Sequence, residues 1–294
     1  MLSSREIVRL KLIYNPAAGR GRARRHVGEA AEYLRGRGAA VELAESNSPA
    51  DLTRIAAESS RDSYDRVVVC GGDGTLNLGV RHFDLQRGTL ALLPLGSGDD
   101  FARVSGIPRD VHKACDVVLD GAVREVDVAT ANGLRYLGVA GLGFDSEVAR
   151  YANEEVRYLR GSAVYLYAIL RVLPRFTPHR VRINGREEEI MFAVFGNTPQ
   201  YGGGIRIAPA AQIDDGLLEV CIVHKTSRFQ LLKTLPRAYS GKHVTSPFVE
   251  LRHGAQFNVE SERPMDVYAD GERLTTTPVQ FGFMGHKLRM VMPR

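Results

Sequence analysis

The sequence predicts two domains: an N-terminal α/β domain built on a parallel sheet, and a C-terminal domain of antiparallel β-structure. The chain has 294 residues, which is long for one domain and sufficient for two. Up to residue 124, short apolar runs alternate with helical patterns, as in a parallel sheet covered by helices. Strand-like runs dominate afterwards. We therefore expect domains at 1–124 and 125–284, with 285–294 returning to the first domain.

The N-terminal domain is expected to have a Rossmann-like, three-layer α/β fold. Apolar runs typical of buried strands lie at 8–14, 41–44, 66–70 and 89–93. Helical patterns occupy 22–37, the segment after Ser48-Pro49, and 113–119. Serine followed by proline is typical of a helix start, because the hydroxyl caps the first turn and proline fits the first helical position. Gly38 marks the end of the first helix.

The C-terminal domain is expected to be an antiparallel β-sandwich. Strand-like runs lie at 125–129, 135–139, 180–184, 189–195, 217–223, 257–261 and 265–269. Asn132-Gly133 and Asn184-Gly185 are typical of tight hairpin turns. Helical patterns interrupt the strands at 156–173 and 228–239. The segment 158–173 is apolar nearly all round, which leaves two interpretations open: a core helix beneath the sheets, or a helix that partly lines an apolar substrate cleft.

Composition restricts the class of protein. Three cysteines without partners at metal-ligand spacing indicate buried thiols in a reducing compartment. No apolar run approaches the ~20 residues of a membrane-spanning helix, and charges throughout residues 1–11 are unlike a signal peptide. We therefore expect a cytoplasmic protein with at most peripheral membrane contact.

The net charge of +5 is concentrated in an arginine cluster at residues 20–25. Such a cluster can hold phosphates, an anionic membrane or nucleic acid. Nucleic acid is not expected, because the cluster lacks the interleaved aromatic side chains of a single-strand binder.

A glycine-rich loop, Gly71-Gly72-Asp73-Gly74-Thr75, joins a buried strand to a helix. Glycines let backbone N–H groups approach phosphate oxygens at φ > 0, and the helix N-terminus adds partial positive charge. Thr75 can donate a hydroxyl hydrogen bond, whereas Asp73 suits phosphate only through magnesium or by orienting a donor. The loop is neither the dinucleotide fingerprint nor the P-loop, so an ordinary turn also stays open.

A second loop, Gly96-Ser97-Gly98-Asp99-Asp100, follows the strand at 89–93 and precedes Phe101-Ala102-Arg103. Both loops follow parallel strands, so they should lie at the edge where open α/β sheets bind ligands. A turn with a helix cap from Asp99 or Asp100 is the alternative. Together the two loops predict a site for nucleotide phosphates.

An ordered set of motifs along essentially the whole chain resembles the diacylglycerol kinase catalytic domain family, which includes bacterial lipid kinases and the sphingosine and ceramide kinases. The set comprises Asn15-Pro16 with Gly19, the two loops, Gly141-Leu142-Gly143-Phe144-Asp145, Tyr201-Gly202-Gly203-Gly204, the segment 209–220 and Asp270-Gly271-Glu272. The first loop alone is shared with NAD kinases. The resemblance implies an NAD kinase/diacylglycerol kinase-like fold, with ATP in the cleft between the two domains.

The resemblance also implies roles for individual residues. Glu272 would accept the proton of the acceptor hydroxyl beside Asp270, with Asp73 as a third catalytic residue. The nucleotide site would comprise Asn15, Gly71, Gly72, Gly74, Thr75, Asn77, Gly96, Ser97, Asp100 and Arg103. A magnesium ion would be held by Asp215 and the main-chain oxygens of Gln212 and Leu217. A tight turn at 214–216 without metal is the alternative.

The chain departs from the family pattern at two points. Relatives usually have Gly-Thr-x-Asn-Asp in the second loop, so Ser97 keeps a hydroxyl while Asp99 adds a negative charge. That charge needs a cation or an arginine such as Arg103. Ala44 stands where many relatives have threonine, which removes any nucleotide contact from that side chain.

We therefore expect an ATP- and magnesium-dependent kinase that phosphorylates a primary hydroxyl of a neutral lipid. Diacylglycerol, giving phosphatidic acid, is the default acceptor, and a ceramide or sphingoid base is the rival because of the second loop. An NAD kinase-like enzyme with a soluble substrate and a non-catalytic nucleotide-binding module are further alternatives. The expected partners are the lipid substrate and an anionic membrane, without nucleic acid, and a homodimer stays open.

Overall fold

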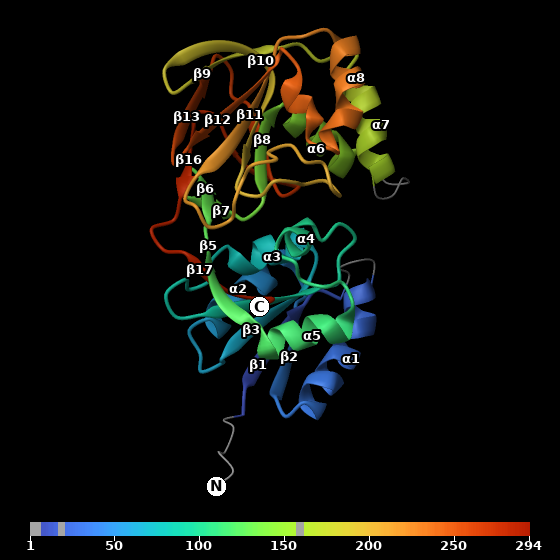
Figure 1. Cartoon of the computed structure of the whole chain (residues 1–294), viewed down its shortest axis with the longest axis vertical. Helices are drawn as coiled ribbons and strands as arrows, with labels where there is room; N and C mark the ends of the chain where they lie inside the picture. Colours follow the sequence, from blue (N-terminus) through green and yellow to red (C-terminus); the bar gives the residue numbers. More distant parts are fainter. Residues whose placement is uncertain (1–6, 17–20, 157–161) are drawn as a thin grey trace. The chain divides into compact units, whose positions relative to one another are not determined.

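A computed structural model describes residues 7–16, 21–156 and 162–294. The chain divides into two compact units, which we describe separately (Figure 1). Unit 1 comprises Met1–Val126 and His286–Arg294, and unit 2 comprises Asp127–Gly285. The sequence analysis placed these boundaries after residues 124 and 284.

Unit 1 is built on one six-stranded sheet in the order β2-β1-β3-β4-β17-β5. Its strands are β1 (Arg9–Tyr14), β2 (Ala40–Glu45), β3 (Arg66–Gly71), β4 (Thr89–Pro94), β5 (Ala122–Val126) and β17 (Leu288–Met292). All pairs are parallel except β17 with β5. The C-terminal strand therefore returns to the first unit between β4 and β5, as the sequence suggested.

Helices cover both faces of this sheet, so the expected three-layer α/β fold is confirmed. Along β3, Val68 and Cys70 pack into one cluster with α1 (Arg22–Gly36) and α5 (Val111–Asp120). Val69 points to the opposite face, where Gly79 of α3 (Asp73–Val80) approaches it closely. A hydrogen bond joins α3 to α2 (Pro49–Ser59), whose first turn is capped by Ser48 as predicted. The short α4 (Asp100–Val104) follows β4.

Unit 2 contains antiparallel strands in one continuous hydrogen-bonded arrangement. They are β6 (Ala129–Ala131), β7 (Leu134–Tyr136), β8 (Val139–Gly143), β9 (His179–Ile183), β10 (Arg186–Gly196), β11 (Leu218–His224), β12 (Val249–Gly254), β13 (Phe257–Ser261), β14 (Asp266–Ala269), β15 (Glu272–Thr276) and β16 (Val279–Phe283). The first half of β10 pairs with β9 and its second half with β8, across an irregularity between Ile190 and Phe192. The expected β-sandwich is therefore present, and β10 joins its two layers.

The predicted hairpin turns are confirmed at Asn132-Gly133 and Asn184-Gly185. All four residues have positive φ, between 48° and 82°, as a two-residue turn of this kind requires. Asp270-Gly271, with φ of 50° and 87°, forms the same kind of turn between β14 and β15.

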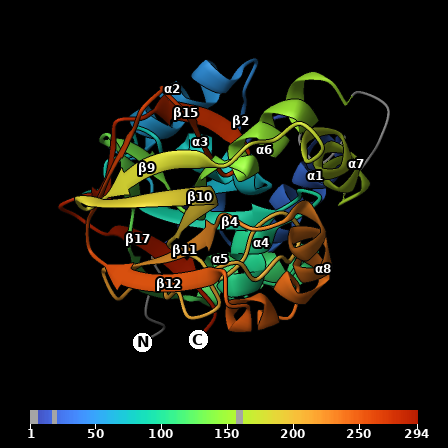
Figure 2. The same ribbon diagram turned by 90° about the horizontal axis from the view of Figure 1, so that it is seen from above.

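Three helices pack on the outer face of β8, β10 and β11, namely α6 (Phe144–Glu154), α7 (Ser162–Val172) and α8 (Arg228–Ala238) (Figure 2). The described part of the apolar segment 158–173 is buried on one side only, as a core helix would be, and its part in a substrate cleft stays a prediction. Ala168 of α7 is fully buried, whereas Leu166, Tyr167 and Leu170 are exposed. Residues 158–161 lie outside the described residues. In the described part of the chain, no helix is long and apolar enough to cross a membrane.

The prediction of one strand over 125–129 is wrong. β5 ends at Val126 and β6 begins at Ala129, so the two pieces belong to different sheets. Between them, the N–H of Asp127 donates to Ile213 O at 2.7 Å, and its carboxylate accepts from Gly216 N at 2.6 Å. Because Asp127 is bonded to residues 213 and 216, it does not pair with a strand of either sheet. The alternation of apolar residues gives no indication of such bonds.

The predicted strand at 135–139 is also divided, between β7 and β8. Its middle residues donate their N–H groups to the carboxylate of Asp270 instead of to a neighbouring strand. The three cysteines are buried free thiols, as expected. Burial raises the pKa of the Cys115 and Cys221 thiols to about 12.

Candidate functional site

The first glycine loop leads from β3 directly into α3. The glycines at its start are required by close approach and not by the positive φ that the sequence analysis assumed. A Cβ on Gly71 would lie 2.5 Å from the side chain of Thr75, which packs back against the loop. A Cβ on Gly74, by contrast, would meet nothing within 4 Å. The N-terminus of α3 is therefore open beside Gly74, where the backbone can receive an anion.

The two loops predicted to hold phosphate lie against each other. A Cβ on Gly96 would come within 2.3 Å of Gly72 Cα, so only glycine fits on either side of this contact. The N–H of Leu95 also donates to Gly71 O at 3.0 Å. The sheet thus brings both loops to one edge, as the strand order predicted.

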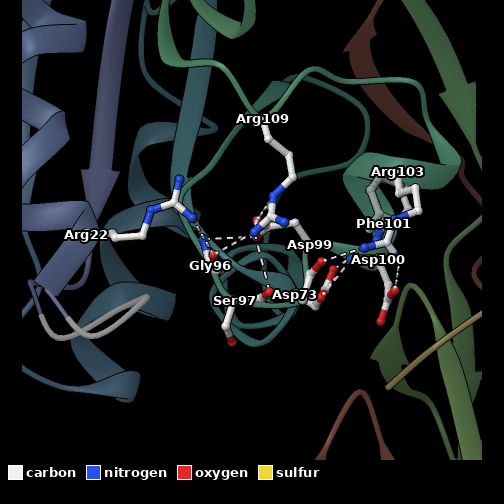
Figure 3. Close-up of polar contacts among 10 residues, drawn as sticks. Arg22, Asp73, Gly96, Ser97, Asp99, Asp100, Phe101, Arg103 and Arg109 are labelled. Carbon is white, nitrogen blue, oxygen red and sulfur yellow. Dashed lines mark hydrogen bonds and ion pairs between the residues drawn. The ribbon is translucent and has the colours of Figure 1, made fainter. Parts of the chain in front are cut away.

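The side chain of Asp73 fixes the start of α4. Its two carboxylate oxygens accept hydrogen bonds from the backbone N–H groups of Asp100 and Phe101, at 3.0 and 2.9 Å (Figure 3). Asp73 therefore binds the second loop to the first. Each oxygen retains a second lone pair that can bind a metal ion, so these contacts are compatible with a catalytic role. The assignment of Asp73 as a catalytic residue stays a prediction.

Arg109 compensates the charge of Asp99. The Asp99 side chain is fully buried; its Oδ1 accepts from Gly96 N at 2.9 Å and its Oδ2 accepts from Arg109 Nε at 3.0 Å (Figure 3). Burial raises the pKa of Asp99, and Arg109 opposes that rise. The sequence analysis suggested Arg103 for this role, but Arg103 pairs with Asp100 at 2.8 Å.

Two arginines converge on one carbonyl of the second loop. Arg22 Nη1 donates to Gly96 O at 3.1 Å, and Arg109 Nη2 donates to the same oxygen at 3.3 Å. The Ser97 side chain is exposed and points away from these arginines (Figure 3). Two guanidinium groups thus lie beside the second loop. Arg109 is paired with Asp99, whereas Arg22 has no carboxylate partner among the described residues. Arg20, part of the predicted cluster, lies outside them.

Asn77 has a buried amide without a partner. Its side chain is 1% exposed, and neither its Nδ2 nor its Oδ1 makes a hydrogen bond with the described residues. Buried polar groups are almost always hydrogen-bonded, so an unsatisfied amide one turn after the glycine loop suits a position that a ligand or water completes. Asn15, at the carboxyl end of neighbouring β1, takes part in polar contacts of its own.

In unit 2, the Asp270-Gly271-Glu272 turn separates two acidic side chains. The carboxylate of Asp270 accepts from the N–H groups of Leu137, Gly138 and Val139 at 3.2, 3.1 and 2.9 Å. Glu272 is the first residue of β15 and is half-buried. Asp270 therefore holds the turn against the start of β8, and the assignment of Glu272 as the base stays a prediction.

Helix α6 also positions this turn. Asn153 Nδ2 donates to Gly271 O at 2.7 Å. At the start of α6, the hydroxyl of Tyr201 donates to Asp145, whose pKa burial raises to about 6. Two of the motifs from the sequence analysis thus contact each other here, at Asp145 and Tyr201, within unit 2.

The predicted magnesium ligands lie in a tight turn of unit 2. Asp215 Oδ1 accepts from Leu217 N at 2.9 Å, and Gly216 has φ of 72°. The other oxygen of Asp215 makes no hydrogen bond with the described residues, so it can bind a hard cation together with main-chain oxygens. The site at Gln212, Asp215 and Leu217 stays a prediction. The alternative, a tight turn without metal, stays open as well.

Among the described residues, one cluster has the spacing of a metal site made of side chains, namely Glu188, His224 and Glu250. Arg252 pairs with Glu188 at 2.6 Å and with Glu250 at 2.8 Å, and Arg186 lies within 3.7 Å of both. The hydrogen bond from Arg252 lowers the pKa of Glu250 to about 2. We interpret the cluster as an ion-pair network, because two arginines already neutralise the carboxylates.

Comparison with known proteins identifies the family. The model of the diacylglycerol kinase catalytic domain matches residues 9–131, and the YegS C-terminal NAD kinase beta sandwich-like domain matches residues 138–292. A diacylglycerol kinase of Mycobacterium tuberculosis is 32% identical and covers 100% of this chain and 98% of its own. The chain belongs to the diacylglycerol kinase family.

Other relatives extend this likeness. A diacylglycerol kinase of Bacillus subtilis is 28% identical over 97% of both chains. The crystal structure of a proposed diacylglycerol kinase from Bacillus anthracis aligns with a TM-score of 0.82 at 26% identity, covering 99% of this chain and 98% of that one. The chain is therefore a lipid kinase, and its two-domain fold is that of the family, as the motifs predicted.

Family membership implies ATP as the phosphoryl donor, and unit 1 fits it. The open side of Gly74, the unsatisfied amide of Asn77 and the guanidinium of Arg22 are features that a triphosphate would complete. A divalent metal ion would neutralise phosphate charge there.

Sequence reasoning missed three residues that organise the site. Arg109 neutralises Asp99, Asp127 holds the 213–216 turn, and Asn153 holds the β14–β15 turn. For Asp127 the sequence offered one indication, because an acidic residue within the apolar run at 125–129 is unusual for a buried strand. No local pattern marks Arg109 or Asn153, because their partners are 10 and 118 residues away in the sequence.

Proposed function

We propose that this lipid kinase transfers the γ-phosphoryl group of ATP to the primary hydroxyl of diacylglycerol, giving phosphatidic acid. One observation carries the proposal. In a chain similar over its full length to diacylglycerol kinases, Glu272 is a half-buried carboxylate on a turn that Asp270 and Asn153 hold in place. An acceptor hydroxyl needs such a base.

Each unit contributes different groups to the proposed reaction. In unit 1, the backbone N–H groups of residues 71–75 and the side chains of Asn77 and Arg22 bind the ATP phosphates. Asp73 and Asp100 are the carboxylates of unit 1 that would hold a magnesium ion, which would supply charge neutralisation for the phosphates. Unit 2 supplies Glu272, which accepts the hydroxyl proton as the oxygen attacks phosphorus and ADP leaves.

The exposed apolar side chains of α7 support a lipid acceptor. Leu166, Tyr167 and Leu170 present a contiguous apolar face, which a soluble acceptor such as NAD would not need. The second loop, by contrast, gives no support to a ceramide or sphingoid base. The described contacts of Asp99 are to Gly96 and Arg109, so this acid serves the loop itself.

A panel of acceptors with labelled ATP tests the substrate. Diacylglycerol, ceramide and sphingosine would be supplied in mixed micelles, and NAD in buffer. We expect transfer to diacylglycerol. Transfer to ceramide or sphingosine alone would replace the proposed acceptor, transfer to NAD alone would exclude a lipid, and ATP binding without any transfer would indicate a non-catalytic module.

Glu272→Gln tests the base. We expect kcat to fall by about 10²–10⁴-fold, because the amide cannot accept the proton, while ATP affinity stays unchanged. Glu262→Gln is the matched control, since Glu262 is an exposed acid of the same unit. Equal turnover of Glu272→Gln and the control would show that the base has been misassigned.

A further inference from the structure

Helix α8 exposes an unusual combination of side chains. Phe229 is 75% exposed, the highest value among the large apolar side chains of the described residues, and Leu232 and Tyr239 are 37% and 50% exposed. Leu231, Thr234 and Ala238 lie on the opposite side of the helix and are buried. The outward side of α8 is therefore apolar where a surface helix is ordinarily polar.

The same segment lacks acidic residues. No Asp or Glu occurs between Glu219 and Glu250, although 34 in 294 residues would correspond to about three in a segment of this length. Five Lys and Arg residues occur there: Lys225, Arg228, Lys233, Arg237 and Lys242. The apolar side of α8 thus lies within a stretch of uniformly positive charge.

Most of these cations have no carboxylate partner among the described residues. Lys225 pairs with Glu189 at 3.0 Å and is neutralised. Arg228 instead donates to Phe176 O and Arg237 to Thr245 Oγ1, which leaves both charges uncompensated. Lys233 and Lys242 are exposed and form no ion pair within the described part of the chain. Among the described residues, Arg228, Lys233 and Arg237 of α8 and Lys242 after it therefore have no carboxylate partner.

Helix α8 is firmly placed on unit 2. Ser227 and Gln230 form a complete capping box at its start, and Leu231 packs into the core beneath α6 and α7. The outward residues are therefore held as one preformed face, which we call the α8 face: Phe229, Leu232, Lys233, Arg237 and Tyr239.

We propose that the α8 face docks on an anionic lipid bilayer, with Phe229 and Leu232 entering the interface and the cations meeting lipid phosphates. Interfacial helices combine a surface-exposed apolar side with Lys and Arg in this way, and long cationic side chains can reach headgroups while their stems stay apolar. A second copy of the chain fits less well, because a symmetric contact would place Lys233 and Arg237 opposite their own equivalents.

The inference rests on the proposed lipid acceptor, since a kinase of membrane lipids must stay at the bilayer, but its test measures binding and not phosphorylation. The chain contains no tryptophan, so Phe229→Trp introduces a single fluorescent reporter. We expect its emission to shift to shorter wavelength with phosphatidylglycerol vesicles and not with phosphatidylcholine vesicles. Leu134→Trp, at an exposed position of β7, should show no shift.

Charge neutralisation gives the second arm. Lys233→Gln with Arg237→Gln should raise the phosphatidylglycerol concentration for half-maximal binding by roughly tenfold. Arg87→Gln with Arg124→Gln removes the same net charge from exposed positions of unit 1 and should change it little. Circular dichroism checks that all variants remain folded.

Three outcomes would overturn the proposal: an unshifted Phe229→Trp emission while the protein still pellets with vesicles, equal loss of binding in the two double variants, or a shift that appears without vesicles as the protein dimerises. Phosphorylation of a short-chain diacylglycerol in solution separates the two proposals. The α8 variants should retain it fully, whereas its absence from the unmodified protein would remove the proposed function and leave the binding result intact.

Discussion

At the scale of single residues, the acidic side chains of the site motifs act largely as backbone clamps. Asp73 and Asp270 accept hydrogen bonds from main-chain N–H groups of another segment, and Asp99 accepts one from Gly96 within its own loop. A carboxylate suits this task because a bond from N–H to an ionised acceptor is stronger than one to a neutral acceptor. An acid within a predicted site motif is therefore not automatically a base or a metal ligand.

The pair of Asp99 and Arg109 can be tested by a double-mutant cycle. Arg109→Gln should lower the free energy of unfolding by about 1–3 kcal/mol, because it leaves a buried carboxylate without its cation. This loss is smaller than for a fully buried ion pair, because solvent screens the half-exposed arginine. Asp99→Asn should be nearly neutral, since the amide oxygen can still accept from Gly96. The double variant should recover most of the loss in urea unfolding.

Arg124→Gln, on the exposed side of β5, is the control and should leave the unfolding free energy unchanged. Strict additivity of the two single substitutions would show that Arg109 acts independently of Asp99.

At the scale of elements, the β14–β15 turn that leads into Glu272 depends on a helix that is remote in the sequence. The β14–β15 turn contacts α6 through Asn153 and the start of β8 through Asp270. Glu272 follows the turn directly, so a small displacement of Gly271 changes where its carboxylate lies. Positioning of this kind affects turnover more than folding.

Asn153→Ala should therefore lower kcat by about tenfold with little change in KM or in the free energy of unfolding. Steady-state kinetics with the acceptor identified by the panel would measure it. Asn153→Gln, whose longer amide can still donate, should restore part of the activity. If both variants turn over as fast as the unmodified enzyme, the turn is positioned without Asn153.

At the scale of the molecule, the chain crosses from one unit to the other and back. β17 lies between β4 and β5 in the sheet of unit 1, although all of unit 2 precedes it in the sequence. Its Leu288, Met290 and Val291 are at most 1% exposed. The sheet of unit 1 is therefore complete only when β17 has joined it.

A chain ending at Gly285 should lose the fold of unit 1 even though it retains both glycine loops. Removing β17 forfeits burial worth roughly 5 kcal/mol or more, which is comparable to the whole stability of a domain. ATP binding and resistance of residues 1–126 to trypsin would both be lost. Removal of only Pro293 and Arg294 should change neither. Unchanged ATP affinity of the shorter chain would contradict this role of β17.

The sequence determined the local features of this protein. Apolar periodicity predicted the α/β layers, Ser48-Pro49 a helix start, and Asn-Gly pairs the hairpins, because each depends on residues close together in the chain. The ordered motifs also indicated the family and the kinase activity. These features include the glycine loop at 71–75, although its first two glycines are required by close approach to Thr75 and Gly96, and not by positive φ.

The tertiary structure alone decided which charges meet. Arg109 and not Arg103 neutralises Asp99, Asp127 ends one sheet and holds a turn of the next, and Asp270 binds the start of β8. The α8 face likewise becomes visible only when burial separates Leu231 from Phe229. Such partners are set by the packing of distant segments, and a linear pattern of residue types contains no record of that packing.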